Sequence, residues 1–251
     1  MLAFFRRIRK SLLGSGQVQK YLFYSIGEIA LVVIGILIAL QINNWNENQK
    51  LRQYEIEILG EIRIGLLETK TEVTQAIEDD LRWRACNYKI LSFLDERKDY
   101  DPSLDQCFGC YYWSSTAQFT TSAYDELKIK GLELISNPQL RKELTILFDS
   151  KFDVVKSEVE VWDSELLNST IYPLHTQLFR KYFPKSWSVF EDEFAKPVNY
   201  ENLFNNEPFK NLLSEIISLR NYSITVNQAL EGDIQHLITS IDNELEVFNK
   251  N

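Results

Sequence analysis

Three cysteines are the residues whose type and spacing come closest to a chemical site in this chain. Cys107 and Cys110 form a C-F-G-C pair, and Cys86 lies upstream of them. A zinc site would need a second Cys/His pair, and the two histidines, His175 and His236, are isolated. A thioredoxin-like redox pair would need a βαβ context, which the surrounding sequence lacks. We therefore expect a structural disulfide in an oxidising compartment, either Cys107–Cys110 or a link from Cys86 to one of the two.

Catalytic and cofactor motifs are otherwise missing from the sequence. It contains no G-x-S-x-G nucleophile elbow, no glycine-rich phosphate loop and no H-E-x-x-H zinc motif. Carboxylates are frequent, but at this density a pair of them carries little information. We therefore expect no enzymatic activity, no cofactor and no bound metal.

Aromatic residues gather directly after the C-F-G-C pair, in the run Tyr111, Tyr112 and Trp113. Aromatic side chains concentrated in a loop can anchor a partner protein, because each of them buries a large area in a protein interface. They can equally pack over the end of a helical bundle. Both interpretations stay open, and we keep the three residues as a candidate partner contact.

Residues 21–42 form a long apolar run with a single charged residue, Glu28. A helix of this length spans about 33 Å at about 1.5 Å per residue, enough for a hydrocarbon core of about 30 Å. Aromatic residues near both ends, Tyr24 and Trp45, suit the headgroup region. The alternatives are a buried core helix and a cleaved signal peptide, but the run is too long for the latter and lacks its small-residue cleavage site. We expect an uncleaved transmembrane signal-anchor helix at residues 21–44.

One face of this predicted span combines an acid with small residues. At about 100° per residue, Glu28, Gly35 and Ala39 lie close together around the helix. Gly35 and Ala39 form a small-xxx-small pair, which lets two helices approach closely, and an acid inside a span usually faces protein. We predict a helix–helix contact face at these three residues. The alternative is that Glu28 reaches the membrane interface or is protonated.

Charge is distributed unevenly along the chain. Residues 1–20 contain five basic residues and no acid, whereas the whole chain has a net charge of -9. The positive-inside rule then places residues 1–20 in the cytoplasm and the body, residues 45–251, on the far side of the membrane. For an inner-membrane protein that far side is the periplasm. An acidic body also argues against a nucleic-acid partner, because affinity for phosphates comes largely from Lys and Arg.

The body is predicted to consist of long helices with few breaks. Glycine and proline number only 9 and 6, and apolar residues recur every three or four positions, as in amphipathic helices. The fold class is therefore all-α, with one membrane-spanning helix continuing into an up-down helical bundle. We expect a helix that continues from the span to about residue 93, followed by a long connection at 95–121. A short helix should then be opened by Ser122, in a capping box with Asp125, and closed by Gly131. The next helix should start at Asn137 and Pro138 and be kinked or ended by Pro173, and an irregular stretch at 184–208 should lead to a last helix at 208–248.

Two segments of the chain carry a family resemblance. The run YSIGEIALVVIGILIALQINNWNE follows the basic segment FFRRIRKSLL, and the second segment reads SAYDELKIKGLELISNPQLRKEL. Both resemble an uncharacterised family of single-span membrane proteins in Bacteroidota, the domain of unknown function number 6090. That family often has serines where this chain has Ile129 and Lys130. The resemblance implies an inner-membrane protein with a helical periplasmic body, and it supplies no activity and no catalytic residues.

These features favour a non-enzymatic scaffold or accessory subunit of a homo-oligomeric or larger membrane complex. Its expected partners are the lipid bilayer and either a second copy of the chain or another membrane protein, contacted through the face of Glu28, Gly35 and Ala39. The alternative function is a periplasmic ligand-sensing bundle. With a single predicted span, such a sensor would have to signal through a membrane partner.

Overall fold

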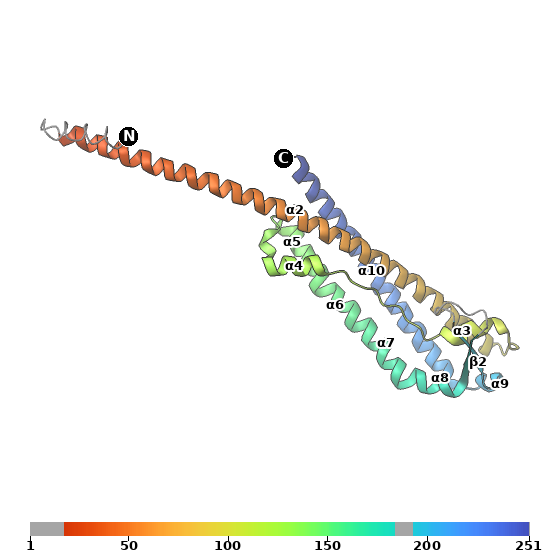
Figure 1. The fold of residues 1–251 in the computed structure, drawn as a ribbon. Helices are drawn as coiled ribbons and strands as arrows, with labels where there is room; N and C mark the ends of the chain where they lie inside the picture. The colour runs from red at the N-terminus through yellow and green to blue at the C-terminus, as the bar shows by residue number, and fades with distance from the viewer. Residues whose placement is uncertain (1–17, 184–192, 251) are drawn as a thin grey trace. The chain divides into compact units, whose positions relative to one another are not determined.

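The computed structural model describes residues 18–183 and 193–250, and the chain divides into two compact units, Met1–Tyr54 and Glu55–Asn251 (Figure 1). The basic segment expected in the cytoplasm lies outside the described residues except for its last three positions. Part of the stretch predicted to be irregular, residues 184–192, also lies outside them.

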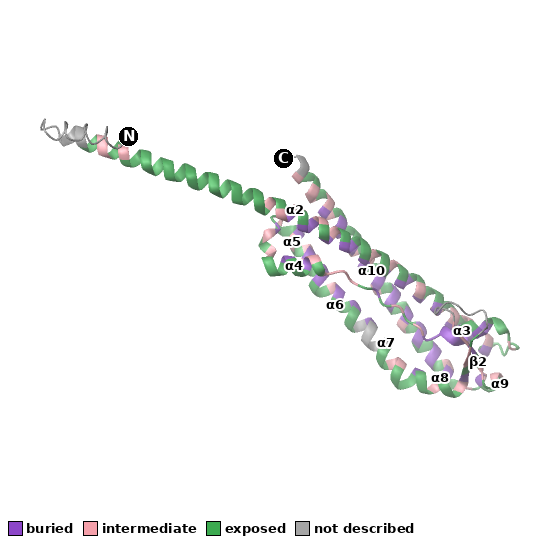
Figure 2. Ribbon diagram, in the orientation of Figure 1, coloured by how far each residue is buried: buried purple, intermediate pink, exposed green. Residues whose placement is uncertain are grey.

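The first unit contains the N-terminal part of helix α2 (Val18–Asp95). The first proline of the chain is Pro102, so nothing interrupts the backbone hydrogen bonds of this helix. Its large aliphatic side chains from Leu22 to Ile42 are exposed all around the helix (Figure 2). The helix is long and apolar enough to cross a membrane, with a mean hydropathy of 2.3 in its most apolar window and no residue of that window buried. The predicted apolar helix is thereby confirmed.

The second unit is a bundle of antiparallel helices, as predicted. It is built from the C-terminal part of α2, a middle helical column at residues 138–178 and helix α10 (Glu207–Lys250) (Figure 1). Side-chain pairs join residues 63–95 of α2 to residues 210–242 of α10. The two helices are antiparallel, because the residue numbers of the paired positions rise along α2 as they fall along α10. These pairs are Arg63 with Asp242, Thr74 with Glu231, and Asp95 with Lys210.

The middle column alternates α-helical and π-helical turns. One π-helical segment ends at Ile171, two residues before Pro173, whose ring nitrogen cannot donate to the helical ladder. The column continues beyond this proline and ends at Leu178, so Pro173 is not its end. Its segments are α5 (Pro138–Ile146), η3 (Leu147–Lys151), α6 (Phe152–Val154), η4 (Val155–Glu160), α7 (Val161–Leu166), η5 (Leu167–Ile171) and α8 (Tyr172–Leu178).

Shorter elements connect these long ones. The connection predicted at 95–121 contains a helix that the sequence did not reveal, and the stretch predicted to be irregular contributes two paired strands. The short elements are η1 (Pro102–Leu104), α3 (Asp105–Cys110), α4 (Ser122–Lys130, closed by Gly131 at a φ of 110°), η2 (Leu132–Leu134), β1 (Phe179–Tyr182), β2 (Phe194–Pro197) and α9 (Tyr200–Leu203). The strands are antiparallel, with Phe179 opposite Pro197.

Two predicted helix starts have different outcomes. Asn137 caps α5 as expected, because its side chain accepts hydrogen bonds from two backbone N–H groups of the first turn, with Pro138 following it. At α4 the capping box is wrong. The cap residue is Thr121 rather than Ser122, and its hydroxyl donates to the Asp125 carboxylate at 2.9 Å without binding the backbone.

The body buries two separate hydrophobic clusters, and Figure 2 shows buried residues in purple along its helices. We call the first the helix-packed core; it is mainly aliphatic and includes Ile58, Leu59, Ile62, Leu66, Val73, Ile77, Leu127, Leu140, Leu144, Leu147, Ile234, Leu237 and Ile241. We call the second the disulfide-bonded core; it includes Ile90, Leu94, Leu104, Cys107, Phe108, Tyr111, Tyr112, Phe179, Leu203, Phe209, Leu212, Leu213 and Ile216.

A buried ion pair lies between the two clusters. Asp80 of α2 and Arg220 of α10 have side chains only 0% and 3% exposed, and the Arg220 Nε lies 3.7 Å from an Asp80 carboxylate oxygen. On α2 Asp80 falls after the last residue of the helix-packed core, Ile77, and on α10 Arg220 falls before the first one, Ile224. The pair therefore marks the level at which one core gives way to the other.

Candidate functional site at the disulfide-bonded core

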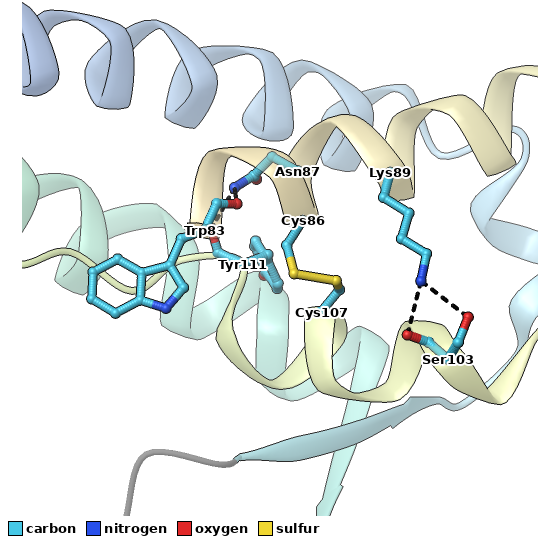
Figure 3. The surroundings of a disulfide bond; sticks show 7 residues. All are labelled: Trp83, Cys86, Asn87, Lys89, Ser103, Cys107 and Tyr111. Carbon is cyan, nitrogen blue, oxygen red and sulfur yellow. Dashed lines mark hydrogen bonds between the residues drawn. A yellow bond between two sulfur atoms is a disulfide. The ribbon is translucent and has the colours of Figure 1, made fainter. Parts of the chain in front are cut away.

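A disulfide joins helix α2 to the short helix α3. It links Cys86 to Cys107, with 5.0 Å between their Cα atoms (Figure 3). This is one of the pairings that the sequence left open. Cys110 takes no part in the disulfide and is buried.

Two α2 side chains that follow Cys86 hold the chain on either side of α3, at Tyr111 after it and at Ser103 before it. The Asn87 side chain donates to the carbonyls of Trp83 and Tyr111, at 2.9 and 2.8 Å (Figure 3). The Lys89 ammonium donates to the carbonyl and the hydroxyl of Ser103, at 3.1 and 3.0 Å. The covalent bond and these contacts fix α3 against α2 at both of its ends.

Close packing on the other side of α3 depends on a glycine. A Cβ placed on Gly109 would lie 2.0 Å from the backbone oxygen of Glu193, the residue that precedes β2. Real Cβ atoms do not approach an oxygen this closely, so only glycine lets the backbone of α3 meet this segment.

The three aromatic residues after α3 face inward. Tyr111 is 0% and Tyr112 6% exposed, and both belong to the disulfide-bonded core, while Trp113 is half-buried against Trp83. The hypothesis of a partner contact is therefore wrong for Tyr111 and Tyr112. Tyr111 packs against Phe179 and Phe209, and Tyr112 packs against Tyr172 and His175, so both rings remove a large apolar area from water. The alternative, packing over the end of the bundle, describes what these rings do.

A buried histidine lies within this aromatic cluster. His175 of α8 is 3% exposed, its ring stacks on Phe179 and contacts Tyr112, and neither ring nitrogen has a hydrogen-bond partner. Burial is the main cause that lowers the pKa of His175 to about 4; the nearby Lys181 ammonium acts in the same direction and the Glu193 carboxylate opposes the shift. His175 is therefore neutral at neutral pH.

A buried carboxylate organises the outer side of α3. Asp105 accepts hydrogen bonds from the phenols of Tyr100 and Tyr182, and the Lys196 ammonium lies 3.8 Å away. Burial is the main cause that raises the pKa of Tyr182 to about 12, and the contact with Asp105 adds to it. Asp105 thus ties the connection after α2 to both strands. The sequence offered no signal for it, because one carboxylate among many cannot be singled out.

The remaining predicted residues are placed as follows. His236 of α10 is exposed, and the described part of the chain contains no group of three His, Cys, Asp or Glu residues that could hold a metal ion. In the apolar part of α2, Glu28 is half-buried, Gly35 and Ala39 are exposed, and a Cβ on Gly35 would meet no atom within 4 Å. Their contact with another helix stays a prediction.

The residues at this end of the bundle have a structural role, because they hold separate segments of the chain together. The disulfide, the glycine contact and the buried carboxylate hold segments that are distant in sequence, and its one buried histidine packs among aromatic rings.

Comparison with models of protein families gives one match. Residues 28–192 match the Family of unknown function (DUF6090), a range that covers more than half of the chain and contains α2 beyond Glu28, α3, α4 and the middle column. No curated protein and no solved structure matches the chain.

Proposed function

Since the chain belongs to the DUF6090 family, whose function is unknown, we propose a function from its own residues. The protein is a non-enzymatic, single-span inner-membrane protein that serves as a scaffold or accessory subunit of a homo-oligomeric or larger membrane complex. The observation that carries this proposal is the first unit itself. It is one helix whose aliphatic side chains are exposed on every side and whose apolar run contains an acid.

The assembly role rests on the face of Glu28, Gly35 and Ala39. A lipid-facing helix needs no acid, and a carboxylate in hydrocarbon is costly unless protein or water meets it. Open space around Gly35 allows a second backbone to approach closely. The same face can serve a second copy of the chain or a helix of another membrane protein.

The orientation rests on charge and on the disulfide. Basic residues precede the apolar helix, and the positive-inside rule puts them in the cytoplasm. A Cys86–Cys107 disulfide forms and persists in an oxidising compartment such as the periplasm. Both observations support a periplasmic body.

Assembly is tested by extracting the full-length protein from membranes into nanodiscs and measuring the mass of the particles. Ala39→Leu, on the proposed face, should weaken assembly about tenfold, because the larger side chain keeps a partner helix at a distance. Ala30→Leu is the matched control, since Ala30 lies about 180° around the helix from Ala39. Glu28→Leu should act in the same direction as Ala39→Leu.

Two results would contradict the assembly role. One is a parent protein that is monomeric and copurifies with no other protein. The other is equal assembly of the Ala39→Leu and Ala30→Leu variants. Orientation is checked separately with alkaline phosphatase fused to the C-terminus, which is active only outside the cytoplasm; an inactive fusion would overturn it.

A further inference from the structure

A pocket of about 390 Å³ opens at the end of the bundle where α2 finishes. This volume falls within the range of about 300–1,000 Å³ that is typical of small-molecule sites. Its lining comes from two segments, the residues just after α2 and those around α9. The lining residues are Arg97, Asp99, Tyr100, Asn199, Tyr200, Glu201 and Phe204.

Aromatic rings form a fixed wall of this pocket. Tyr100, Tyr200 and Phe204 are half-buried, each packs against the disulfide-bonded core, and each also lines the pocket. The Tyr100 and Tyr200 rings lie 5.3 Å apart, and the Tyr200 and Phe204 rings 5.2 Å. Tyr200 donates a hydrogen bond to the Lys98 carbonyl at 3.2 Å, and Tyr100 donates to Asp105. The wall is therefore held in place before any ligand arrives.

An arginine occupies a position that the backbone would give to glycine. After α2, the N–H of Arg97 bonds to the Leu94 carbonyl and that of Lys98 to the Phe93 carbonyl, which is the hydrogen-bond pattern of a Schellman motif. Arg97 takes the left-handed position of that motif, with a φ of 51°. Glycine is favoured there because a Cβ is strained at positive φ. The backbone conformation at this position therefore favours glycine and does not explain why the residue is an arginine.

That side chain is directed at the pocket wall. The Arg97 guanidinium lies 5.7 Å from the centre of the Phe204 ring and donates to the Asn205 side chain at 2.7 Å. Beside it, the pocket is lined by the carboxylates of Asp99 and Glu201 and by the Asn199 amide. The carbonyl oxygen of that amide accepts from the Asn202 N–H, which leaves its NH₂ group as a donor.

From this combination we infer that the pocket binds a neutral saccharide unit. Arg97 can only donate, Asp99 and Glu201 can only accept, and a ligand that satisfies all of them must do both. Sugar hydroxyls donate and accept at once, and the C–H face of a pyranose ring is apolar and packs on aromatic rings. The site lies wholly on the body, so the inference is independent of whether the apolar helix assembles with a partner.

Charged ligands fit this lining less well. A cationic ligand would be attracted by the carboxylates of Asp99 and Glu201, but the guanidinium of Arg97 already faces the Phe204 ring that such a ligand would need. An anionic ligand would meet two carboxylates. Neutral polyols without a ring would satisfy the polar groups but leave the aromatic wall uncovered.

The test is isothermal titration calorimetry on the full-length protein in nanodiscs, because maltoside detergents carry sugar headgroups. The probes are maltotriose and the trimer of N-acetylglucosamine, which separate plain glucan chemistry from N-acetylated glycan chemistry. Glycerol and choline serve as the open-chain polyol and the cation. We expect saturable binding of at least one trisaccharide and none of glycerol or choline.

Arg97→Gly is the decisive variant. It relieves the left-handed strain, so the unfolding temperature should equal or exceed that of the parent, while saccharide affinity falls about tenfold. Glu201→Gln, which keeps the shape of the side chain, should weaken binding to a similar degree. Arg82→Ala is the control: it removes an exposed arginine that lies in α2 and outside the pocket, and it should leave saccharide binding unchanged.

The proposal is overturned if neither trisaccharide binds, if choline binds in their place, or if Arg97→Gly and Glu201→Gln bind as tightly as the parent. Weaker binding in Arg97→Gly with an undiminished unfolding temperature supports it, because loss of fold then cannot explain the result.

Discussion

The helix-packed core and the disulfide-bonded core share helices α2 and α10 but are built by different means. The helix-packed core uses aliphatic side chains that recur at helical spacing on long elements. In the disulfide-bonded core, α3, β1, β2 and α9 are all 6 residues or shorter, and a covalent bond, a glycine contact and a buried carboxylate hold them. The first core therefore depends on many interchangeable contacts, and the second on a few individual atoms.

The largest difference between the cores should come from adding one methyl group to a glycine in each. Gly109→Ala puts a Cβ into the backbone before β2, so we expect a loss of more than about 3 kcal/mol in the free energy of unfolding. Gly60→Ala, in α2 beside the helix-packed core, meets no atom within 4 Å and should stabilise the helix by about 1 kcal/mol. Chemical denaturation measures both, and similar values would erase the distinction.

Removing the disulfide should cost slightly less and act on one core. The bond closes a loop with a sequence separation of 21, so Cys86→Ala with Cys107→Ala should lower the free energy of unfolding by about 3 kcal/mol. Hydrogen exchange should show faster exchange in α3 and unchanged protection in α5. Cys110→Ala, also buried but not in the disulfide, is the control and should cost only about 1 kcal/mol. Equal loss of protection in both helices would contradict a separate role for the bond.

The smallest effect should come from acid. Because the pKa of His175 is lowered to about 4 in the folded protein from an ordinary value near 6.5, the unfolded state binds more protons between these values. The neutral ring of His175 makes its full contribution to the free energy of unfolding above about pH 6.5. This contribution decreases as the pH falls towards 4, and by about pH 5 the free energy of unfolding is lower by about 2 kcal/mol.

His175→Gln should remove this part of the pH dependence. His236→Gln, at a histidine whose side chain is 72% exposed, is the matched control in the region of the helix-packed core. Thermal unfolding from about pH 7.5 to about pH 5 gives both profiles. A parent whose stability does not change over this range would contradict the proposed role of the buried ring.

The two cores also differ in how far the sequence predicts them. The long helices, the Asn137 cap and the apolar helix follow from periodicity, capping chemistry and length, which are local properties of the chain. The disulfide-bonded core depends on contacts between segments far apart in sequence. The choice of Cys107 as the partner of Cys86 required the position of α3, which no local pattern indicates.

Individual residues show where local reasoning ends. Tyr111 and Tyr112 could face out or in until the strands that cover them are known. Asp105 is one acid among 36 until its burial is seen. Arg97 is an ordinary surface arginine in sequence, and only its φ of 51° and its place over Phe204 distinguish it.

The buried pair of Asp80 and Arg220 sets the alignment of the two longest helices. Sliding α10 along α2 by one turn, about 5.4 Å, would leave aliphatic faces that still suit each other, since helical spacing repeats. The same slide would separate the two charges and leave both buried among apolar neighbours, at a cost of about 3–5 kcal/mol. This buried pair thus contributes more to rejecting slipped bundles than the more exposed pairs of Arg63 with Asp242 and of Asp95 with Lys210 do.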